Sequence, residues 1–534
     1  MSSTRIATPL LALFLLSGLA GLSQAQDKLV LQEGVLELEN VAEPGETPLY
    51  GAAYFSPYES LDQRLLAALE QAKPGSTVYM SYYSISFNEY PKMFRKLRDK
   101  GVKIRLNLYE KEALAEYKKI DDELKADGFD VELIPNLRNS TGYGSMHTKF
   151  TVVNNELVVT GSANLSASAS LANHEHVVVV QNKALARRYK SEWYEQRRAQ
   201  RVMKKALTDA EWDHFNTAFS NPFPAGWKGS SREEDLKRDL ARVDRRTRNP
   251  HKIVQGWFSP EDDLEEKCRT EIRKATKTVH VAMYTFVNGL VNDLVYVANK
   301  GVKVVVIADD HQMDMEFAAW VNEKLENTPN IRYVRATNHL GLYSSLHHKY
   351  AVVDGNVVLG GSYNWTGNAT HYNDENLIVF HGKKIADRFE NDFASMLAEY
   401  DPQGPVLPVQ VAGNSTRTLF AVKIPFEVPR GYTVQVLVRD AASQDERVVE
   451  LRHSRSTGEN WLGSTDLPRG KTVTWRVRIG NSKGMAGVLD GSGGGKVYEE
   501  AADAHSLDVR PDGLAQIVHD RWTAATPTDI DDDE

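Results

Sequence analysis

The sequence has one cysteine, no excess of positive charge and, beyond its first 25 residues, no long hydrophobic run. Because Cys268 has no second cysteine to pair with, no internal disulfide can form and stability must come from packing. The formal net charge of −8 at pH 7 excludes a global positive field that would condense the whole chain on nucleic acid or an anionic membrane, although a local basic cleft is compatible with it. No later apolar run is long enough to cross a bilayer, so no transmembrane anchor is expected in the mature protein.

The N-terminus has the composition of a secretory signal. Arg5 is the only charge before an almost wholly apolar run over residues 9–22, and small residues end at Ala25. A membrane anchor is the alternative, but the run is short for a bilayer span. We therefore expect cleavage after Ala25, an N-terminal leader over residues 26–48 and a secreted or periplasmic protein.

The single cysteine falls within a helical pattern. Cys268 lies four residues after Leu264 and four before Ile272, which places the three side chains on one face of a helix. This spacing favours a buried core thiol over a nucleophile.

The chain repeats itself with a period near 200 residues. Residues 54–57 (YFSP) recur as 257–260 (WFSP), and residues 100–104 (KGVKI) recur as 300–304 (KGVKV). Each unit alternates strand-like apolar runs with amphipathic segments of helix length, which indicates βαβ units with helices on both faces of a sheet. We predict an α/β fold of two pseudo-symmetric domains, each with a mixed sheet, packed about a pseudo-twofold axis. Their expected limits are 49–220 for the first repeat and 251–402 for the second, with a linker at 221–250.

A charged segment, residues 183–205, is predicted to be a helix that closes the first repeat. Its basic residues can contact phosphate or form a solvated face, and the charge pattern favours the solvated face. The residues concerned are Arg197, Arg198, Arg201, Lys204 and Lys205.

The composition changes after Tyr400. Short strand-like runs separated by Gly, Pro and Asp turns predict a small β-sandwich over residues 406–510. An acidic tail is expected over residues 511–534, with disorder over residues 529–534. Around Trp461 and Trp475 the sequence weakly resembles carbohydrate modules of the starch-binding type. The resemblance implies a carbohydrate partner stacked on these aromatic side chains, and the alternative is that both are core residues.

Both repeats carry the same polar residues at the same spacing. In each, a His-x-Lys sequence is followed by Asn or Asp, by Gly-Ser, by Asn and by a Glu 28 residues after the His. A single His-x-Lys occurs by chance, but retention of the whole set in two diverged copies indicates a function. The first set is His147, Lys149, Asn154, Ser162, Asn164 and Glu175, and the second is His347, Lys349, Asp354, Ser362, Asn364 and Glu375.

These residue types suit phosphodiester cleavage. Strand alternation puts His147 and Lys149 on one face, and a turn at residues 154–155 returns the chain as a second strand. Two Lys ammonium groups and two Asn amides can hold and neutralise the phosphate, while one imidazole attacks phosphorus and the other protonates the leaving oxygen. Glu175 and Glu375 are the candidates that orient the histidines. The histidines could instead bind a metal, but no further cluster has ligand spacing and the lysines supply positive charge, so no metal or other cofactor is expected.

The paired motifs resemble those of the phospholipase D superfamily, the HKD phosphodiesterases, over residues 54–400, and the second repeat is most similar to the nuclease and cardiolipin-hydrolase branch. The resemblance implies two α/β domains with one site at their interface, metal-independent cleavage through a phosphohistidine, His147 as the nucleophile and His347 as the general acid. Asn154 departs from the family's usual Asp, and we expect this position to be mainly structural, with activity retained and a less stable first half-site. His348, between the second His and Lys, should point away from the site.

We therefore expect an exported, monomeric phospholipase D-type enzyme that hydrolyses the headgroup phosphodiesters of phospholipids. A secreted nuclease acting on DNA or RNA is the nearest alternative, because both substrates are phosphodiesters. A phospholipid synthase is a third, although family synthases usually have transmembrane helices. A further alternative is an inactive protein that binds phosphodiesters or polysaccharide, motivated by Asn154 and the added sandwich, and two intact residue sets argue against it.

Overall fold

The computed structural model describes most of the chain between residues 49 and 524. The predicted signal, most of the predicted leader and linker, and residues 525–534 of the predicted tail lie outside the described residues. The described ranges are 36–39, 49–109, 115–134, 144–211, 231–241, 252–338, 340–341, 344–409, 411–440, 446–454, 457–481, 485, 496–501 and 504–524.

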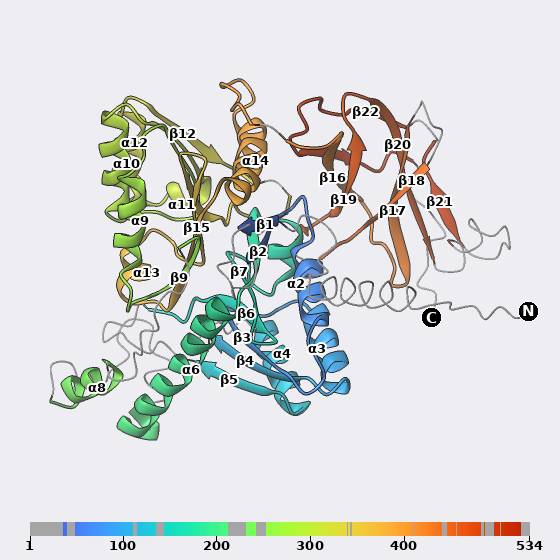
Figure 1. Ribbon diagram of the computed structural model, residues 1–534. Helices are drawn as coiled ribbons and strands as arrows, with labels where there is room; N and C mark the ends of the chain where they lie inside the picture. The colour runs from blue at the N-terminus through green and yellow to red at the C-terminus, as the bar shows by residue number, and fades with distance from the viewer. Residues whose placement is uncertain are drawn as a thin grey trace, which may run out of the picture.

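The first repeat is built on an eight-stranded mixed sheet (Figure 1). In sheet order its strands are β1 (Leu36–Glu39), β2 (Leu49–Ser56), β8 (Glu175–Gln181), β7 (Leu157–Gly161), β6 (Lys149–Val153), β3 (Thr77–Tyr82), β4 (Lys103–Tyr109) and β5 (Asp130–Ile134). Its helices are α2 (Leu61–Glu70), α3 (Glu89–Asp99), α4 (Ala115–Ala126), α5 (Ala167–Leu171) and α6 (Lys183–Ala206). Strands β3, β4 and β5 are parallel, and the other pairs are antiparallel. Apolar side chains of α2, α3 and α4 are buried on one face of this sheet and those of α6 on the other.

The second repeat has the same plan with seven strands. In sheet order they are β12 (Ile331–Ala336), β11 (Lys303–Asp309), β10 (Thr278–Met283), β13 (Lys349–Val353), β14 (Val357–Gly361), β15 (Glu375–His381) and β9 (Val254–Ser259). Its helices are α9 (Leu264–Ile272), α10 (Leu290–Asn299), α11 (Asp310–Met313), α12 (Ala319–Glu326), α13 (Gly367–His371) and α14 (Lys383–Tyr400). The prediction of two α/β domains with mixed sheets is confirmed. Cys268 is fully buried between Leu264 and Ile272 on α9, as the spacing predicted.

One continuous apolar cluster joins the two repeats. It contains residues from the facing sides of both sheets together with α6 and α14, among them Phe150, Trp193, Tyr350 and Phe389. None of the described helices is long and apolar enough to cross a membrane. The two sheets therefore share a core, which fixes the edges of the two repeats relative to each other.

Two predictions about surface segments are corrected by the structure. Arg197 of α6 is not on a solvated face, because it is buried and its guanidinium bonds Asp130 and Asn107. Arg201 on the same helix is exposed as predicted. Within the predicted linker, residues 231–241 form a helix, α8 (Ser231–Ala241).

The C-terminal domain consists of two small sheets, as predicted for a sandwich. One contains β19 (Asn460–Pro468), β16 (Ser415–Lys423) and β23 (Gln516–Arg521), and the other contains β18 (Glu446–Leu451), β17 (Tyr432–Asp440), β20 (Thr472–Asn481), β21 (Val497–Glu499) and β22 (His505–Asp508). Because β23 pairs in parallel with β16, the sandwich extends past the predicted boundary at Arg510 into the segment assigned to the tail. Trp475 is buried against His505, so it is a core residue and not a stacking platform for sugar. Arg452 joins the sandwich to the first repeat through a bidentate ion pair with buried Asp62, at 2.7 and 3.0 Å.

Candidate active site

The two His-x-Lys sequences lie where the repeats meet. Each histidine directly precedes a hairpin, β6–β7 in the first repeat and β13–β14 in the second. The backbone N–H of His147 donates to the carbonyl oxygen of Asp374 at 2.8 Å, and that of His347 donates to the carbonyl oxygen of His174 at 2.9 Å. Each histidine is thus bonded to the residue that precedes the motif glutamate of the other repeat, which brings both predicted sets to one interface.

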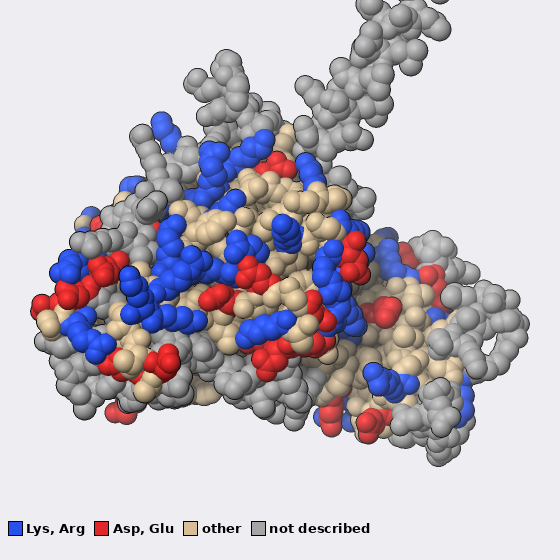
Figure 2. Space-filling view, turned by 90° about the horizontal axis from the view of Figure 1, so that it is seen from below, with Lys and Arg blue, Asp and Glu red and all other residues tan. Residues whose placement is uncertain are grey.

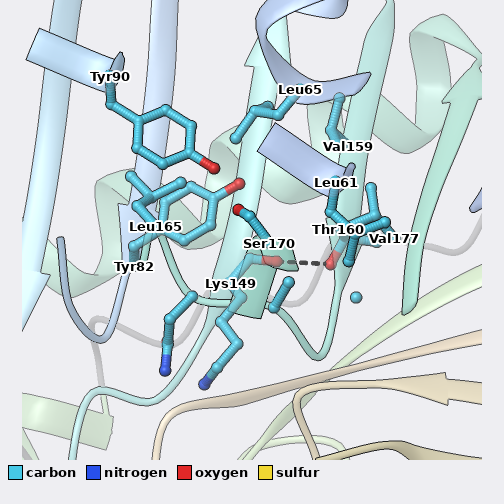
Figure 3. A pocket seen from close by; sticks show the side chains of 13 residues that line it. Leu61, Leu65, Tyr82, Tyr90, Lys149, Val159, Thr160, Leu165, Ser170 and Val177 are labelled. Carbon is cyan, nitrogen blue, oxygen red and sulfur yellow. Dashed lines mark hydrogen bonds between the residues drawn. The ribbon is translucent and has the colours of Figure 1, made fainter. Parts of the chain in front are cut away.

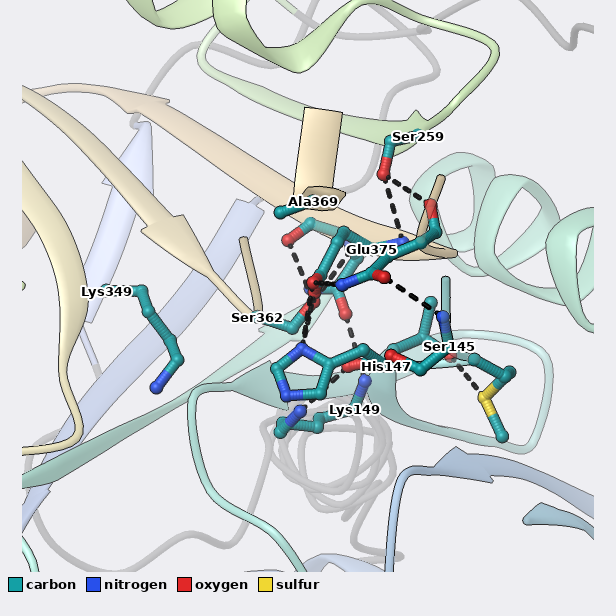
Figure 4. A network of polar contacts seen from close by, with 12 residues as sticks. Ser145, His147, Lys149, Ser259, Lys349, Ser362, Ala369 and Glu375 are labelled. Atoms are coloured by element: carbon teal, nitrogen blue, oxygen red, sulfur yellow. Dashed lines mark hydrogen bonds and ion pairs between the residues drawn. The ribbon is translucent and has the colours of Figure 1, made fainter. Parts of the chain in front are cut away.

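The histidine–glutamate pairs cross this interface. Nδ1 of His147 lies 2.8 Å from a carboxylate oxygen of Glu375 (Figure 4). Nδ1 of His347 lies 2.7 Å from one of Glu175. Both carboxylates are fully buried, whereas the imidazoles retain 13% and 14% of their exposure. Burial raises the pKa of Glu175 to about 7. Each carboxylate can therefore hold the Nδ1–H tautomer of the opposite imidazole and leave Nε2 to react.

The two lysines bring positive charge to the same place. Nζ of Lys149 donates to the carbonyl oxygen of His147 at 2.8 Å, and Nζ of Lys349 donates to that of His347 at 2.7 Å. Figure 4 shows Lys149 beside the His147 imidazole and Lys349 across from it. Both lysine side chains are almost completely buried. Two buried ammonium groups in one cleft favour an anion between them.

Burial and mutual repulsion shift the pKa values of these bases downward. Burial lowers the pKa of His147, and the carboxylate of Glu375 opposes this. Burial, together with the charges of both lysines and of His147, lowers the pKa of His347 well below its usual range. Burial lowers the pKa of Lys349 to about 7, and Lys149 adds to the effect. A bound phosphate would favour the protonated forms and so prepare one imidazole to act as an acid.

Two segments of the chain, residues 65–196 and 268–397, match the family model described as "Cardiolipin synthase, PLD-like domain". The chain belongs to the phospholipase D superfamily. Its relatives include the mitochondrial cardiolipin hydrolases of Chlamydomonas reinhardtii, 31% identical over 22% of this chain and 51% of that protein, and of Xenopus tropicalis, 30% identical over 24% and 59%. The chain thus spans between half and three fifths of the length of these relatives. A solved structure of phosphatidylserine synthase from Haemophilus influenzae Rd KW20 is 12% identical over 65% of this chain and 86% of that one, with a TM-score of 0.45.

Two tyrosines complete the cleft of this phospholipase D superfamily member, and the sequence reasoning missed both. The ring of Tyr83 lies 4.9 Å from that of His147 and faces Lys149, and the ring of Tyr284 lies 4.7 Å from that of His347 and faces Lys349. Tyr83 directly follows β3 and Tyr284 directly follows β10, inside the apolar runs duplicated at residues 78–85 and 279–286, so alignment of the repeats was the signal that could have found them.

The Gly-Ser turns of the superfamily motif support the carboxylates. Ser362 Oγ accepts a hydrogen bond from the N–H of Asn376 at 2.9 Å and donates to Glu375 at 2.6 Å. Ser162 Oγ accepts the equivalent bond from the N–H of His176 at 2.9 Å. Asparagines two residues before each glutamate, at 173 and 373, also donate to it, at 3.2 and 2.8 Å, and the sequence reasoning did not single these out.

The two predicted phosphate-holding asparagines lie at the ends of the β7 and β14 hairpin strands. Asn164 and Lys149 line a small cavity of about 10 Å³ beneath Tyr82 and Tyr90 (Figure 3). The amide oxygens of Asn164 and Asn364 are buried, and neither has a hydrogen-bond partner among the described residues. The Asn164 amide oxygen is thus available to a ligand.

Asn154 and Asp354 lie away from the cleft and anchor turns. Asp354 accepts four hydrogen bonds of 2.8–2.9 Å from the segment 276–278. Asn154 accepts one from the N–H of Lys73 at 3.0 Å and donates one to the carbonyl oxygen of Gln71 at 2.8 Å. Asn154 thus makes two hydrogen bonds where Asp354 accepts four, and the lower stability expected of the first half-site stays a prediction.

His348 points away from the cleft, as expected, into a buried polar cluster. Its Nδ1 lies 3.4 Å from Nδ1 of His176, and its Nε2 lies 3.3 Å from Asp392 of α14. Burial lowers the pKa of His348 well below its usual range and that of His176 to about 3, so both imidazoles are neutral. Among the described residues, no group of three or more His, Cys, Asp or Glu side chains is arranged to hold a metal ion.

Proposed function

We propose that the chain is an exported phospholipase D-type phosphodiesterase that hydrolyses the headgroup phosphodiesters of phospholipids without a metal ion. The observation that carries the proposal is the pair of crossed His–Glu contacts flanked by two buried lysines at one interface. Similarity to mitochondrial cardiolipin hydrolases supports a phospholipid substrate. The lysines supply the positive charge that a diester phosphate needs.

The chemistry proceeds in two displacements at phosphorus. Nε2 of His147 attacks, the bond from phosphorus to the leaving alcohol oxygen breaks, and protonated His347 gives its proton to that oxygen. The product is a phosphohistidine, whose positive imidazole is stabilised by Glu375. His347, now neutral, takes a proton from water as the water oxygen attacks phosphorus, and the N–P bond breaks to restore His147. The lysines hold the phosphate oxygens throughout.

A nuclease on the same machinery remains the competing function. Nucleic acid would require a long basic groove and a binding affinity that falls steeply with salt. On the face shown in Figure 2, Lys and Arg side chains are interspersed with Asp and Glu, and the chain carries a net charge of −8. These features favour the lipid substrate.

The test is a substrate panel in EDTA. Phosphatidylcholine, phosphatidylethanolamine, cardiolipin, single-stranded DNA, duplex DNA and RNA are offered to the wild type, His147→Ala and His347→Ala, with the exposed sandwich residue His453→Ala as the matched control. We expect headgroup release by the wild type and the control, and loss in both site variants. Cleavage of nucleic acid alone would replace the lipid assignment, and activity in either site variant would refute the shared site. Export is checked by finding the protein outside the cytoplasm with residues 1–25 removed.

A further inference from the structure

A second pocket lies where all three parts of the molecule meet, and none of its lining residues belongs to the two His–Lys–Glu sets. It has a volume of about 250 Å³ and is walled by the segment after β2, by α14 and by the sandwich next to α14 in Figure 1. Tyr58 and Glu59 come from the first repeat, Arg388 and Asp392 from α14, and Arg417 from the sandwich. Because three separate segments form its walls, the pocket exists only in the assembled chain.

Two residues of the pocket wall each carry one buried polar atom that has no hydrogen-bond partner among the described residues. Asp392 has 2% of its side chain exposed; one carboxyl oxygen accepts a hydrogen bond from the Tyr350 hydroxyl at 2.9 Å, and the other has no partner among the described residues. Nε of Arg388 is likewise buried without a hydrogen-bond partner in the described part of the chain. Buried polar groups are nearly always hydrogen-bonded, so this part of the wall is not fully satisfied by the described residues themselves.

The charges of the pocket wall cancel. Arg388 lies 3.6 Å from Glu59, and Arg417 lies 3.0 Å from Asp466 of the sandwich. Burial raises the pKa of Asp392 well above its usual range, which keeps this carboxyl neutral. A phosphate would face Glu59 and Asp466, and an ammonium group would face the two guanidinium groups. The electrostatics therefore favour a ligand without net charge.

We propose that this pocket binds a neutral, polyhydroxylated ligand about the size of one sugar ring. Each carboxylate–guanidinium pair presents an acceptor beside a donor, which matches two neighbouring hydroxyl groups. Tyr58 and Phe55 also belong to the wall, where both side chains are almost fully buried. The volume is below the range of about 300–1,000 Å³ that drug-sized ligands occupy, which fits a single ring. This site differs from the aromatic stacking site that the sequence suggested, since Trp475 is buried.

Calorimetric titration of the full-length protein tests the proposal. The probes are glucose, N-acetylglucosamine, myo-inositol and glycerol, soluble starch as a polymeric source of the same ring, and inorganic phosphate and ethanolamine as charged comparators. We expect saturable binding of at least one neutral ring compound. Arg417→Met should weaken it at least tenfold, because that side chain loses its ion pair and its donors to the ligand. Ala412→Trp, which places a large side chain at the pocket wall, should abolish it.

The matched control is Arg439→Met, which breaks another arginine–glutamate pair of the sandwich, with Glu446, outside the pocket. It should bind as the wild type does. Unchanged thermal unfolding midpoints show that the pocket variants are folded. No saturable binding by any neutral compound, binding that survives both pocket variants, or tighter binding of phosphate or ethanolamine would each overturn the proposal. If starch binds but none of the single-ring compounds does, the site is a groove for a polymer and not a pocket for one ring.

Discussion

Replacing Glu375 by glutamine separates the roles of the two imidazoles. Glu375 accepts hydrogen bonds from Nδ1 of His147, from Ser362 Oγ and from the amide of Asn373, all within 2.9 Å. Glutamine keeps the size and one acceptor oxygen but removes the negative charge. The variant therefore tests the charge without creating a cavity.

The expected magnitude follows from the lost charge. A hydrogen bond to a charged group contributes about 1.5–3 kcal/mol. At about 1.4 kcal/mol for each factor of ten, kcat should fall about 10- to 150-fold. Since the carboxylate opposes the lowering of the His147 pKa by burial, its removal lowers that pKa further. A nucleophile must be unprotonated, so the acidic limb of the kcat–pH profile should move to lower pH.

The partner substitution, Glu175→Gln, should move the opposite limb. It removes a carboxyl group 2.7 Å from His347, and because the charged form of that group favours the imidazolium, its loss should lower the pKa of that imidazole. A general acid must be protonated, so here the basic limb of the profile should move to lower pH. Glu390→Gln is the matched control, because Glu390 contacts His280 at 2.6 Å outside the cleft and should leave both limbs in place.

The assay is steady-state headgroup release against pH, with acid-stable and acid-labile phosphoprotein measured after rapid quenching. If Glu375→Gln shifts the basic limb and Glu175→Gln the acidic limb, His347 is the nucleophile and the assignment is reversed. If neither variant changes kcat or the profile, the crossed contacts have no part in catalysis and the reasoning fails.

Three further experiments test the packing of the chain around the site. Gly361→Ala should cost about 2–6 kcal/mol and lower the thermal unfolding midpoint, since φ is +136° and a Cβ would lie 2.3 Å from the carbonyl oxygen of Asn376; a midpoint equal to that of wild type would contradict this. Arg452→Ala should cost about 3–5 kcal/mol, because it leaves Asp62 buried and unpaired, and limited proteolysis should then release the sandwich faster than in the wild type. Cys268 should react with a thiol reagent only after denaturation, because it is fully buried and burial raises its pKa; labelling of the native protein would show that α9 opens.

The sequence predicted local structure well, because local structure depends on periodicity. Alternation after His147 predicted the hairpin that became β6 and β7, and the helical spacing of Leu264, Cys268 and Ile272 predicted α9. The duplication predicted two domains of one fold. Each of these conclusions needs only neighbouring residues and a comparison of the two copies.

The sequence did not predict which carboxylate meets which imidazole. The contact of His147 with Glu375 depends on how the two sheets pack through α6 and α14, and the repeats carry no local signal for that packing. The burial of Arg197 also depends on a distant strand, β5, that supplies Asp130. Residues 516–521 were predicted to belong to the tail, yet they form β23, which pairs with the neighbouring strand β16.

The crossed carboxylates have a consequence for the origin of the chain. If the chain were cut between the repeats, each fragment would keep one imidazole and one carboxylate that do not contact each other. Both His–Glu contacts would form again only when the two fragments associate. Two identical ancestral copies could have formed both His–Glu contacts as a dimer. Once the copies were joined in one polypeptide, the rest of each copy could diverge in sequence. A substitution at position 175 therefore acts first on His347 of the other repeat. The two repeats must then evolve together at these positions, even where their surfaces diverge.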